Sequence, residues 1–160
     1  MELLGVIGNP IAHSLSPVMH QAALAAAGKQ GIYLAFLVKP EDLGQAVRGA
    51  KALGFTGLNV TIPFKQQVLP YLDALTPEAE SIQSVNTIAF TGGRIVGHST
   101  DGIGFAAAAE HELGYDFTGK TVLVIGDGGA ARAIVAQLLS QQCRVYVTNR
   151  TEARAFTLLD

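Results

Sequence analysis

The sequence predicts an α/β protein in which a mostly parallel, three-layer α/β domain is followed by the start of a second α/β domain. Apolar runs typical of strands alternate with helical segments through residues 1–60, which is the pattern of parallel strands joined by covering helices. The chain also carries 18 glycines in 160 residues, above the average usage of roughly 7%. Many of these glycines fall where one expected element meets the next, as an α/β fold requires.

Five alternating elements are expected in the first part of the chain. Ser16 and Pro17 form the N-cap and N1 pair that opens the first helix, and Gly28 ends it. Pro40 starts the second helix, since the acidic residues that follow it are favoured in a first turn. In chain order, we expect a strand over 3–8, a helix over 18–27, a strand over 31–39, a helix over 40–53 and a strand ending at 59–61.

The corner from Asn59 to Lys65 combines polar groups with an unusual charge. Alternation along a strand places Asn59 and Thr61 on one face and Val60 on the other. Pro63 suits the first position of a following helix, so Lys65 falls in the first turn, where the helix dipole disfavours a cation. Either this is a polar loop with a solvated lysine or it is a functional site, and the stretch alone leaves both interpretations open.

A mixed segment follows this corner. We expect a short helix to about Leu72, a second helix from Thr76, and a β-hairpin of strands 86–90 and 94–98 around a glycine-containing turn. An alanine-rich helix over 103–113 then ends at Gly114. We expect the domain boundary near Asp101–Gly102, with domains over 1–101 and 102–160 and the alanine-rich helix as connector.

A glycine loop opens the second domain. The continuous apolar run 121–125 is typical of a central parallel strand, and a helix is expected over 132–139. Between them, Gly126, Gly128 and Ala131 match the spacing G-x-G-x-x-G/A, which brings a helix N-terminus close to a pyrophosphate. A tight turn without a ligand is the alternative. Asp127 would weaken phosphate binding if its carboxylate pointed inward.

The end of the next strand, over 143–148, indicates which dinucleotide is bound. An NAD site usually has an acidic residue about 20 residues past the glycines, but this chain has Asn149 and Arg150 there, with Arg154 one helical turn away. Arginine binds phosphate through its planar fork, so NADP is favoured over NAD. Two solvated arginines are the alternative. A complete dinucleotide-binding sheet has two βαβαβ halves, so the second domain is incomplete here.

Composition excludes several classes of protein. A net charge of −2 argues against a general nucleic-acid or membrane-surface binder. Cys143 has no partner for a disulfide, which agrees with a reducing compartment. The N-terminal apolar run is too short for a signal peptide, and no stretch approaches the roughly 20 apolar residues of a membrane span. We expect a soluble cytoplasmic protein without a metal, because the four histidines lack zinc-ligand spacing.

Together these motifs resemble shikimate dehydrogenase, an NADP-dependent enzyme family, and they cover essentially the whole chain in the family's order. The matching segments are Gly8-Asn9-Pro10 with Ser14-Leu15-Ser16-Pro17, Asn59-Val60-Thr61-Ile62-Pro63-Phe64-Lys65, Asn86-Thr87, Ser99-Thr100-Asp101-Gly102, the glycine loop, and Asn149-Arg150-Thr151 with Arg154. Each would be a weak match alone, whereas six in register are specific.

The resemblance implies a role for each matching residue. Lys65 and Asp101 would be the catalytic pair, with Lys65 handling the proton on the C3 oxygen. Ser14 and Ser16 would bind the substrate carboxylate. The ring hydroxyls would be bound by Asn59, Thr61, Asn86 and Asp101, and NADP by Gly126, Gly128, Gly129, Ala130, Asn149, Arg150, Thr151 and Arg154. Without the resemblance, helix caps at Ser16 and Asp101 and a turn residue at Asn86 would explain these positions equally well.

The implied function is reversible reduction of 3-dehydroshikimate to shikimate with NADP, in the shikimate pathway of aromatic amino-acid biosynthesis. The expected partner is this small molecule, with no nucleic acid or membrane, in a monomer or homodimer. The alternatives are an NAD-preferring quinate/shikimate dehydrogenase and a non-catalytic ligand-binding module. The family's C-terminal portion, which completes the nucleotide sheet and carries a substrate-binding glutamine, is missing, so little or no activity is expected of the 160 residues alone.

Overall fold

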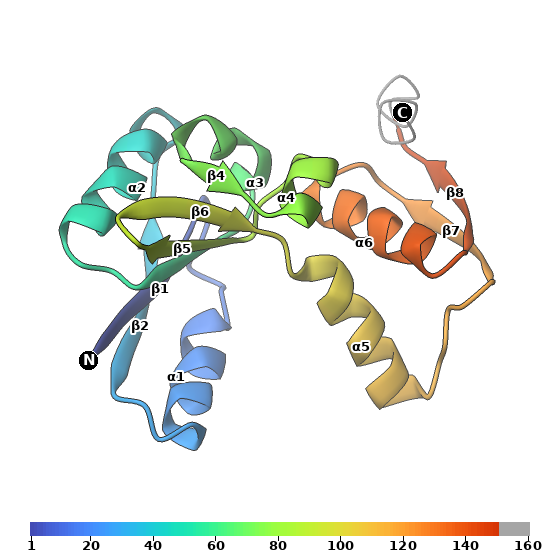
Figure 1. The fold of residues 1–160 in the computed structure, drawn as a ribbon, viewed down its shortest axis with the longest axis horizontal. Helices are drawn as coiled ribbons and strands as arrows, with labels where there is room; N and C mark the ends of the chain where they lie inside the picture. Colours follow the sequence, from blue (N-terminus) through green and yellow to red (C-terminus); the bar gives the residue numbers. More distant parts are fainter. Residues whose placement is uncertain (151–160) are drawn as a thin grey trace. The chain divides into compact units, whose positions relative to one another are not determined.

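The structure, a computed structural model, describes residues 1–150 and divides the chain into two compact units (Figure 1). The N-terminal unit comprises Met1–Glu80 and Val85–His98, and the C-terminal unit comprises Ser81–Ser84 and the chain from Ser99 onward. The domain boundary expected near Asp101–Gly102 stays a prediction.

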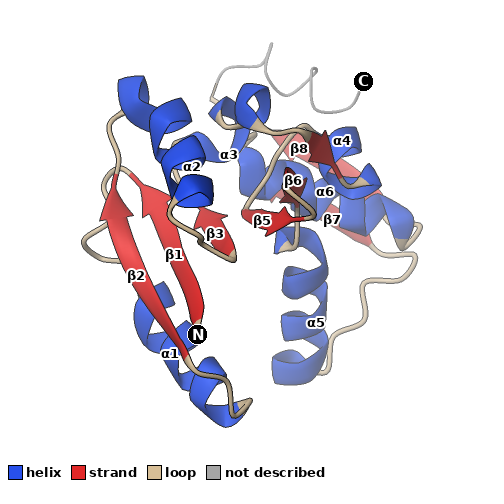
Figure 2. Ribbon diagram, turned by 60° about the vertical axis from the view of Figure 1, so that its left-hand side comes forward, coloured by secondary structure: helices blue, strands red, loops and turns tan. Residues whose placement is uncertain are grey.

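The N-terminal unit is built on one six-stranded, mostly parallel sheet, so the predicted α/β fold class is confirmed. Its first three strands, β1 (Glu2–Gly8), β2 (Gly31–Leu37) and β3 (Gly57–Val60), are parallel and lie side by side in Figure 2. The strand order is β2-β1-β3-β5-β6-β4. The other three strands are β4 (Ala74–Leu75), β5 (Thr87–Thr91) and β6 (Arg94–His98), of which β4 was not predicted.

Two helices join the parallel strands and pack on opposite faces of the sheet. Helix α2 (Leu43–Ala52) contributes Leu43 and Val47 to the main core, in which Val60 is also buried. Helix α1 (Ser16–Ala26) packs on the other face, where Val6 and Tyr33 form a smaller core. A short 3-10 turn, η1 (Pro40–Asp42), precedes α2, so the predicted second helix is split at its start.

The segment after β3 is less regular than predicted. Helix α3 (Phe64–Gln67) has a single turn and is followed by the 3-10 turn η2 (Leu69–Tyr71). Pro70 explains this break, because it has no N–H with which to continue an α-helix. Helix α4 (Pro77–Ile82) begins where Thr76 predicted it.

The hairpin of β5 and β6 closes through two glycines with positive φ, 56° at Gly92 and 73° at Gly93. Positive φ at both central residues defines a type I′ turn, so the predicted glycine turn is confirmed and Thr91 belongs to the strand.

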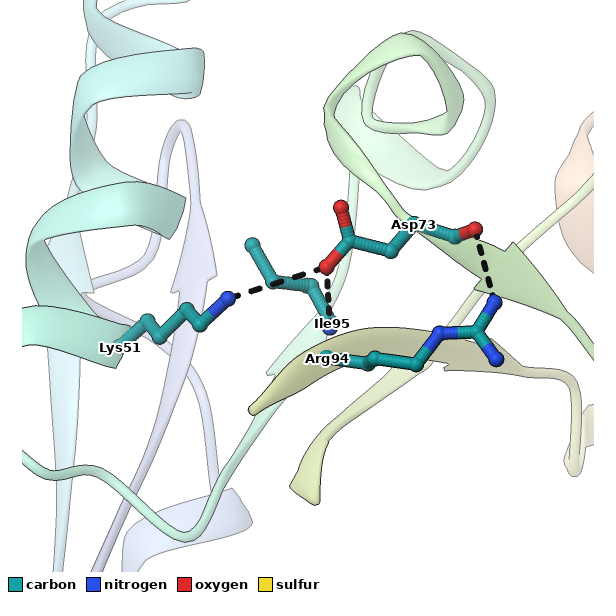
Figure 3. Close-up of polar contacts among 4 residues, drawn as sticks. All are labelled: Lys51, Asp73, Arg94 and Ile95. Atoms are coloured by element: carbon teal, nitrogen blue, oxygen red, sulfur yellow. Dashed lines mark hydrogen bonds and ion pairs between the residues drawn. The ribbon is translucent and has the colours of Figure 1, made fainter. Parts of the chain in front are cut away.

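Asp73 fixes the short strand β4 to the edge of this sheet (Figure 3). Its Oδ2 atom accepts a hydrogen bond from the Ile95 backbone N–H at 2.8 Å and lies 3.8 Å from Lys51 Nζ. Its backbone carbonyl accepts a hydrogen bond from Arg94 Nη2 at 3.3 Å. The ion pair with Lys51 is half-exposed and contributes little by itself. The hydrogen bond from the Ile95 N–H to the Asp73 carboxylate is therefore the main contact that holds Asp73 against β6.

The C-terminal unit pairs two parallel strands, β7 (Thr121–Ile125) and β8 (Arg144–Thr148). Helix α5 (Asp101–Leu113) ends at Gly114 with φ 60°, as predicted. Helix α6 (Gly129–Ser140) packs against α5 and β8. It begins three residues before the predicted 132–139, because Gly129, Ala130 and Ala131 already form its first turn.

Strand β7 differs from the expectation of a strand buried on both faces. Its residues alternate between exposed and partly buried positions, and Leu123 and Ile125 are 61% and 80% exposed. In the described part of the chain β7 pairs only with β8 and one face of the pair is exposed. None of the helices in that part is long and apolar enough to cross a membrane.

Candidate active site

The ends of β1 and β3 bring two of the predicted loops together in the N-terminal unit. The Thr61 N–H donates to the Ile7 carbonyl at 3.0 Å, and the Asn9 N–H donates to the Ile62 carbonyl at 3.0 Å. A Cβ added at Gly8 would lie 2.6 Å from Thr61 Cγ2, so only glycine permits this close approach. Both loops therefore leave the sheet at the carboxyl ends of adjacent parallel strands, where open α/β sheets bind ligands.

Ser14 and Ser16 lie in the first of these loops, at the start of α1. The predicted N-cap at Ser16 is wrong by one residue, because the helix includes Ser16 and its N-cap position is Leu15. The Ser14 hydroxyl oxygen instead accepts a hydrogen bond from the Ser16 N–H at 3.3 Å. Ser14 thus satisfies a free amide of the first turn, which needs a partner outside the helix.

A chain of hydrogen bonds links two of the predicted substrate-binding residues, Asn59 and Asn86. Tyr33 Oη donates to Asn59 Oδ1 at 2.7 Å, and burial raises the pKa of Tyr33 while the Ser16 side chain lowers it. Asn59 Nδ2 donates to Thr87 Oγ1 at 3.0 Å and to the Asn86 backbone carbonyl at 3.3 Å. Thr87 Oγ1 in turn donates to Asn86 Oδ1 at 3.1 Å. The structure therefore joins Asn59 and Asn86 through one polar network that also includes Tyr33 and Thr87.

Tyr33 and Thr87 connect this network, yet sequence reasoning assigned neither of them to the site. Tyr33 is 4% exposed, and a buried tyrosine usually finds a hydrogen-bond partner for its hydroxyl. Burial raises the pKa of Tyr33 to about 12, and the Ser16 side chain partly opposes this shift. The strand pattern of β2 gives the side of the sheet on which Tyr33 lies, but the order of the strands is needed to find its partner.

Lys65 lies in α3, directly after the turn that contains Thr61. Pro63 is the N-cap residue of this helix and not its first residue as predicted. Helix α3 has four residues, so its first turn is also its last and the expected dipole penalty on Lys65 is small. The Lys65 backbone carbonyl accepts a hydrogen bond from the Val85 N–H at 2.8 Å. This contact holds the backbone of Lys65 beside the chain that leads into Asn86.

Asp101 is the first residue of α5 in the C-terminal unit. The sequence pairs it with Lys65, which belongs to the N-terminal unit. The structure describes each unit by itself, and this pairing therefore stays a prediction.

The glycine loop has the strand–loop–helix context that the sequence predicts. Gly126 has a φ of 120°, which favours glycine, and its N–H donates to the Thr148 carbonyl at 2.8 Å. The first hydrogen bond of α6 runs from the Arg132 N–H to the Gly128 carbonyl at 3.0 Å. The preceding amides of the first turn have no acceptor within the helix. A Cβ at Gly126 or Gly128 would meet no atom within 4 Å, so the surface of the loop is open.

The residues predicted to choose the cofactor follow β8 at the same edge. Ile125, the last residue of β7, pairs with Thr148, the last residue of β8. Asn149 and Arg150 therefore leave β8 at the same edge of the sheet at which the glycine loop leaves β7. Thr151 and Arg154 lie outside the described residues. The described part of the chain has no group of three or more metal-ligating side chains.

Two family models match the chain. The shikimate dehydrogenase substrate binding domain matches residues 6–88, which include the polar network, and shikimate / quinate 5-dehydrogenase matches residues 107–160. The chain belongs to the shikimate dehydrogenase family. The first model includes Ser14, Ser16, Asn59, Lys65 and Asn86, and the second includes the glycine loop.

Curated members of the shikimate dehydrogenase family are similar over nearly the whole chain. The shikimate dehydrogenase (NADP(+)) of Thermococcus kodakarensis is 50% identical over 157 residues, which cover 98% of this chain and 57% of that protein. The corresponding protein of Geobacter metallireducens is 48% identical over 160 residues, or 99% and 56%. The chain thus spans about half the length of the curated relatives that it matches.

Solved structures give the same picture. A shikimate dehydrogenase in complex with NADP+ has a TM-score of 0.92 at 42% identity, over 99% of this chain and 54% of that chain. The Thermus thermophilus enzyme in complex with NADP(H) and shikimate has a TM-score of 0.91 at 40% identity, over 99% and 59%. A 5-ketofructose reductase from Gluconobacter also has a TM-score of 0.88 at 35% identity, over 98% and 56%. Fold similarity therefore extends to a relative named for another substrate.

Proposed function

We propose that the protein carrying this chain is an NADP-dependent shikimate dehydrogenase that reversibly reduces 3-dehydroshikimate to shikimate in the shikimate pathway. The observation that carries the proposal is the hydrogen-bonded network of Tyr33, Asn59, Thr87 and Asn86. It arrays polar groups suited to a polyhydroxy acid beside the backbone of Lys65. A cytoplasmic location and a monomeric or homodimeric state belong to the same proposal.

In this proposal, the N-terminal unit binds and orients the substrate. The hydroxyls of Ser14 and Ser16 donate to its carboxylate, and the ring hydroxyls are bound by Asn59, Thr61, Asn86 and Asp101. In the reducing direction, Lys65 Nζ gives a proton to the C3 oxygen while the C3 carbon gains a hydride. In the oxidising direction, Lys65 takes the proton back. Asp101 pairs with Lys65 in this proposal.

The C-terminal unit is suited to hold the cofactor. When the cofactor is bound, its reduced form NADPH would supply the hydride and its oxidised form NADP+ would accept it. Gly126 forms the turn after β7, and Gly128, Gly129 and Ala130 open α6, whose first-turn amides have no acceptor within the helix and suit a pyrophosphate. Asn149 in place of an acid and the guanidinium of Arg150 favour a ribose 2′-phosphate, and we extend the same role to Thr151 and Arg154.

The decisive experiment measures turnover of shikimate with NADP by the full-length protein, followed by NADPH absorbance. We expect Lys65→Ala to lower kcat by about 10²–10⁴-fold, the usual contribution of a general acid–base group. Lys29→Ala, which removes an exposed lysine from the α1–β2 connection, is the matched control and should retain parental activity. No turnover by the parent, or equal activity of Lys65→Ala and the parent, would contradict the proposal.

Two alternatives make different predictions in related assays. An NAD-preferring quinate/shikimate dehydrogenase would have the higher kcat/KM with NAD, whereas the arginine after β8 predicts the higher value with NADP. A non-catalytic module would bind shikimate or NADPH without turnover even as the full-length protein. Titration of the 160-residue chain with each ligand measures binding separately from catalysis.

A further inference from the structure

Tyr33 is held rigidly by α1 and β2, with its hydroxyl directed at Asn59. The His20 ring stacks on the Tyr33 ring with centroids 4.4 Å apart and planes 10° from parallel. Gln21 Oε1 accepts a hydrogen bond from the Tyr33 N–H at 3.3 Å, and Gln21 Nε2 donates to the Gly31 carbonyl at 3.1 Å. The ring and the backbone of Tyr33 are thus fixed from the same helix. Its hydroxyl, 2.7 Å from Asn59 Oδ1, extends past β1 to β3.

The contacts of Asn59 determine how its amide can meet a ligand. Both hydrogens of Nδ2 are directed within the protein, one to Thr87 Oγ1 and one to the Asn86 carbonyl. Reversing the amide would set Oδ1 against the Asn86 carbonyl, two acceptors without a hydrogen between them. Tyr33 donates to Oδ1 in the observed orientation, and a carbonyl oxygen has two lone pairs. What remains for a ligand is one lone pair of Oδ1.

We propose that Tyr33 is a positioning residue that fixes Asn59 as a hydrogen-bond acceptor, so that Asn59 selects substrates with a hydroxyl at the ring position it faces. The inference rests on the proposed function and deepens it. Tyr33 does not touch the substrate. It acts through Asn59, and the selected group is one that donates a hydrogen: a ring hydroxyl, in preference to a ketone, an ether or a fluorine.

The first test is Tyr33→Phe in the full-length protein, because phenylalanine keeps the ring that stacks on His20 and loses only the hydroxyl. We expect KM for shikimate to rise about 3–10-fold, the effect of one neutral hydrogen bond, while kcat and KM for NADP stay unchanged. The control is Tyr71→Phe, which removes the same oxygen from the N-terminal unit at a residue packed against Gly44. It should leave all three constants unchanged.

The second test is a double-mutant cycle with Asn59→Ala. If Tyr33 acts only through Asn59, adding Tyr33→Phe to Asn59→Ala changes KM for shikimate by less than about twofold, because coupled neighbours are not additive. A third measurement uses analogues in which fluorine replaces each of the two non-reacting ring hydroxyls. Fluorine cannot donate a hydrogen bond, so the parent and Tyr33→Phe should bind one of the two analogues with equal affinity. That same analogue binds the parent more weakly than shikimate does.

The outcomes separate this inference from the function on which it rests. A parent that neither turns over nor binds shikimate overturns the proposed function. An active parent with an unchanged KM in Tyr33→Phe overturns the role of Tyr33 alone. Additive effects in the double-mutant cycle, or equal rises in both KM values with a lower Tm, also overturn it, because they indicate a general structural role. If Tyr33→Phe does not fold, the fluorinated analogues with the parent decide: undiminished binding of both overturns the inference.

Discussion

At the scale of single residues, the proposed role of Asn59 rests on how the fold orients a partly buried polar side chain. Its amide makes three hydrogen bonds within the protein, to Tyr33, Thr87 and the Asn86 carbonyl. Each bond contributes modestly to stability, but leaving such a group unpaired would cost more. The same bonds that satisfy the amide also fix its orientation. In the proposed site, stability and ligand selectivity would therefore have the same structural origin at this position.

The raised pKa of Tyr33 predicts a loss of stability at alkaline pH. The pKa is about 12 in the folded chain because of burial, against 10.0 in the unfolded chain. The unfolded state therefore ionises first, and the stabilisation is fully present below pH 10 and is lost as the pH rises toward 12. With about 1.4 kcal/mol per pKa unit, the total loss is on the order of 2–3 kcal/mol. Denaturant unfolding of the 160-residue chain between these pH values measures it.

The matched variants in this experiment are Tyr33→Phe and Tyr71→Phe. Tyr33→Phe has no phenol to titrate at this position, so its stability should fall less steeply with pH than that of the parent. Tyr71→Phe should follow the parent. Parallel curves for the parent and Tyr33→Phe would show that the phenol of Tyr33 ionises as readily in the folded chain as in the unfolded chain.

At the scale of elements, α5 and α6 meet at a glycine. A Cβ added at Gly102 would lie 2.3 Å from the Ala133 carbonyl oxygen and 3.0 Å from the carbonyl carbon. Backbone atoms cannot move aside as a flexible side chain can, so the separation of the two helices depends on this glycine. Gly104, two residues further along the same helix, has open space around it.

These two glycines predict opposite effects of the same substitution. Gly102→Ala should destabilise the C-terminal unit by about 1–3 kcal/mol, the usual cost of overpacking. Gly104→Ala should stabilise it by about 0.5–1 kcal/mol, since alanine favours a helix over glycine. Thermal unfolding of both variants and the parent provides the measurement. Tm shifts of the same sign would show that the contact at Gly102 does not control the packing of α5 on α6.

The elements also show what the sequence can and cannot predict. The alternation that placed Asn59 and Val60 on opposite faces of the strand is confirmed, because it depends only on neighbouring residues: Val60 lies in the main core and Asn59 contacts Tyr33 on the other face. Strand β4 was missed, since its two residues are defined by pairing with β6 and not by a local pattern. The link between Tyr33 and Asn59 was missed for a similar reason. It joins residues on β2 and β3, and β1 lies between these strands.

At the scale of the whole molecule, the candidate residues are divided between the two units. Those proposed for the substrate lie in the N-terminal unit, except Asp101, whereas those proposed for the cofactor lie in the C-terminal unit. The apolar run of β7 predicted a strand buried on both faces, but in the described residues one face of the β7–β8 pair is exposed. A run of apolar residues indicates that both faces of a strand can be buried. Whether they are buried depends on the elements that pack against the strand.

This division predicts that each ligand stabilises a different unit. Shikimate at about 100 times its Kd should slow exchange of the most protected amides of β1 and β3 by about 100-fold, because a ligand that binds only the folded state shifts the opening equilibrium by that factor. The amides of β7 should be unaffected. NADPH should instead protect β7 and the first turn of α6, where free amides are available. Hydrogen exchange followed by mass spectrometry on the 160-residue chain measures both patterns.

Asn59→Ala is the matched variant, since it should reduce protection by shikimate and leave protection by NADPH unchanged. The first turn of α5 provides a further test, because it carries Asp101. If Asp101 binds a ring hydroxyl as proposed, this turn should respond to shikimate although the rest of the C-terminal unit does not. Protection of β7 by shikimate as strong as that of β1 would contradict independent binding, since it would require the two units to open as one.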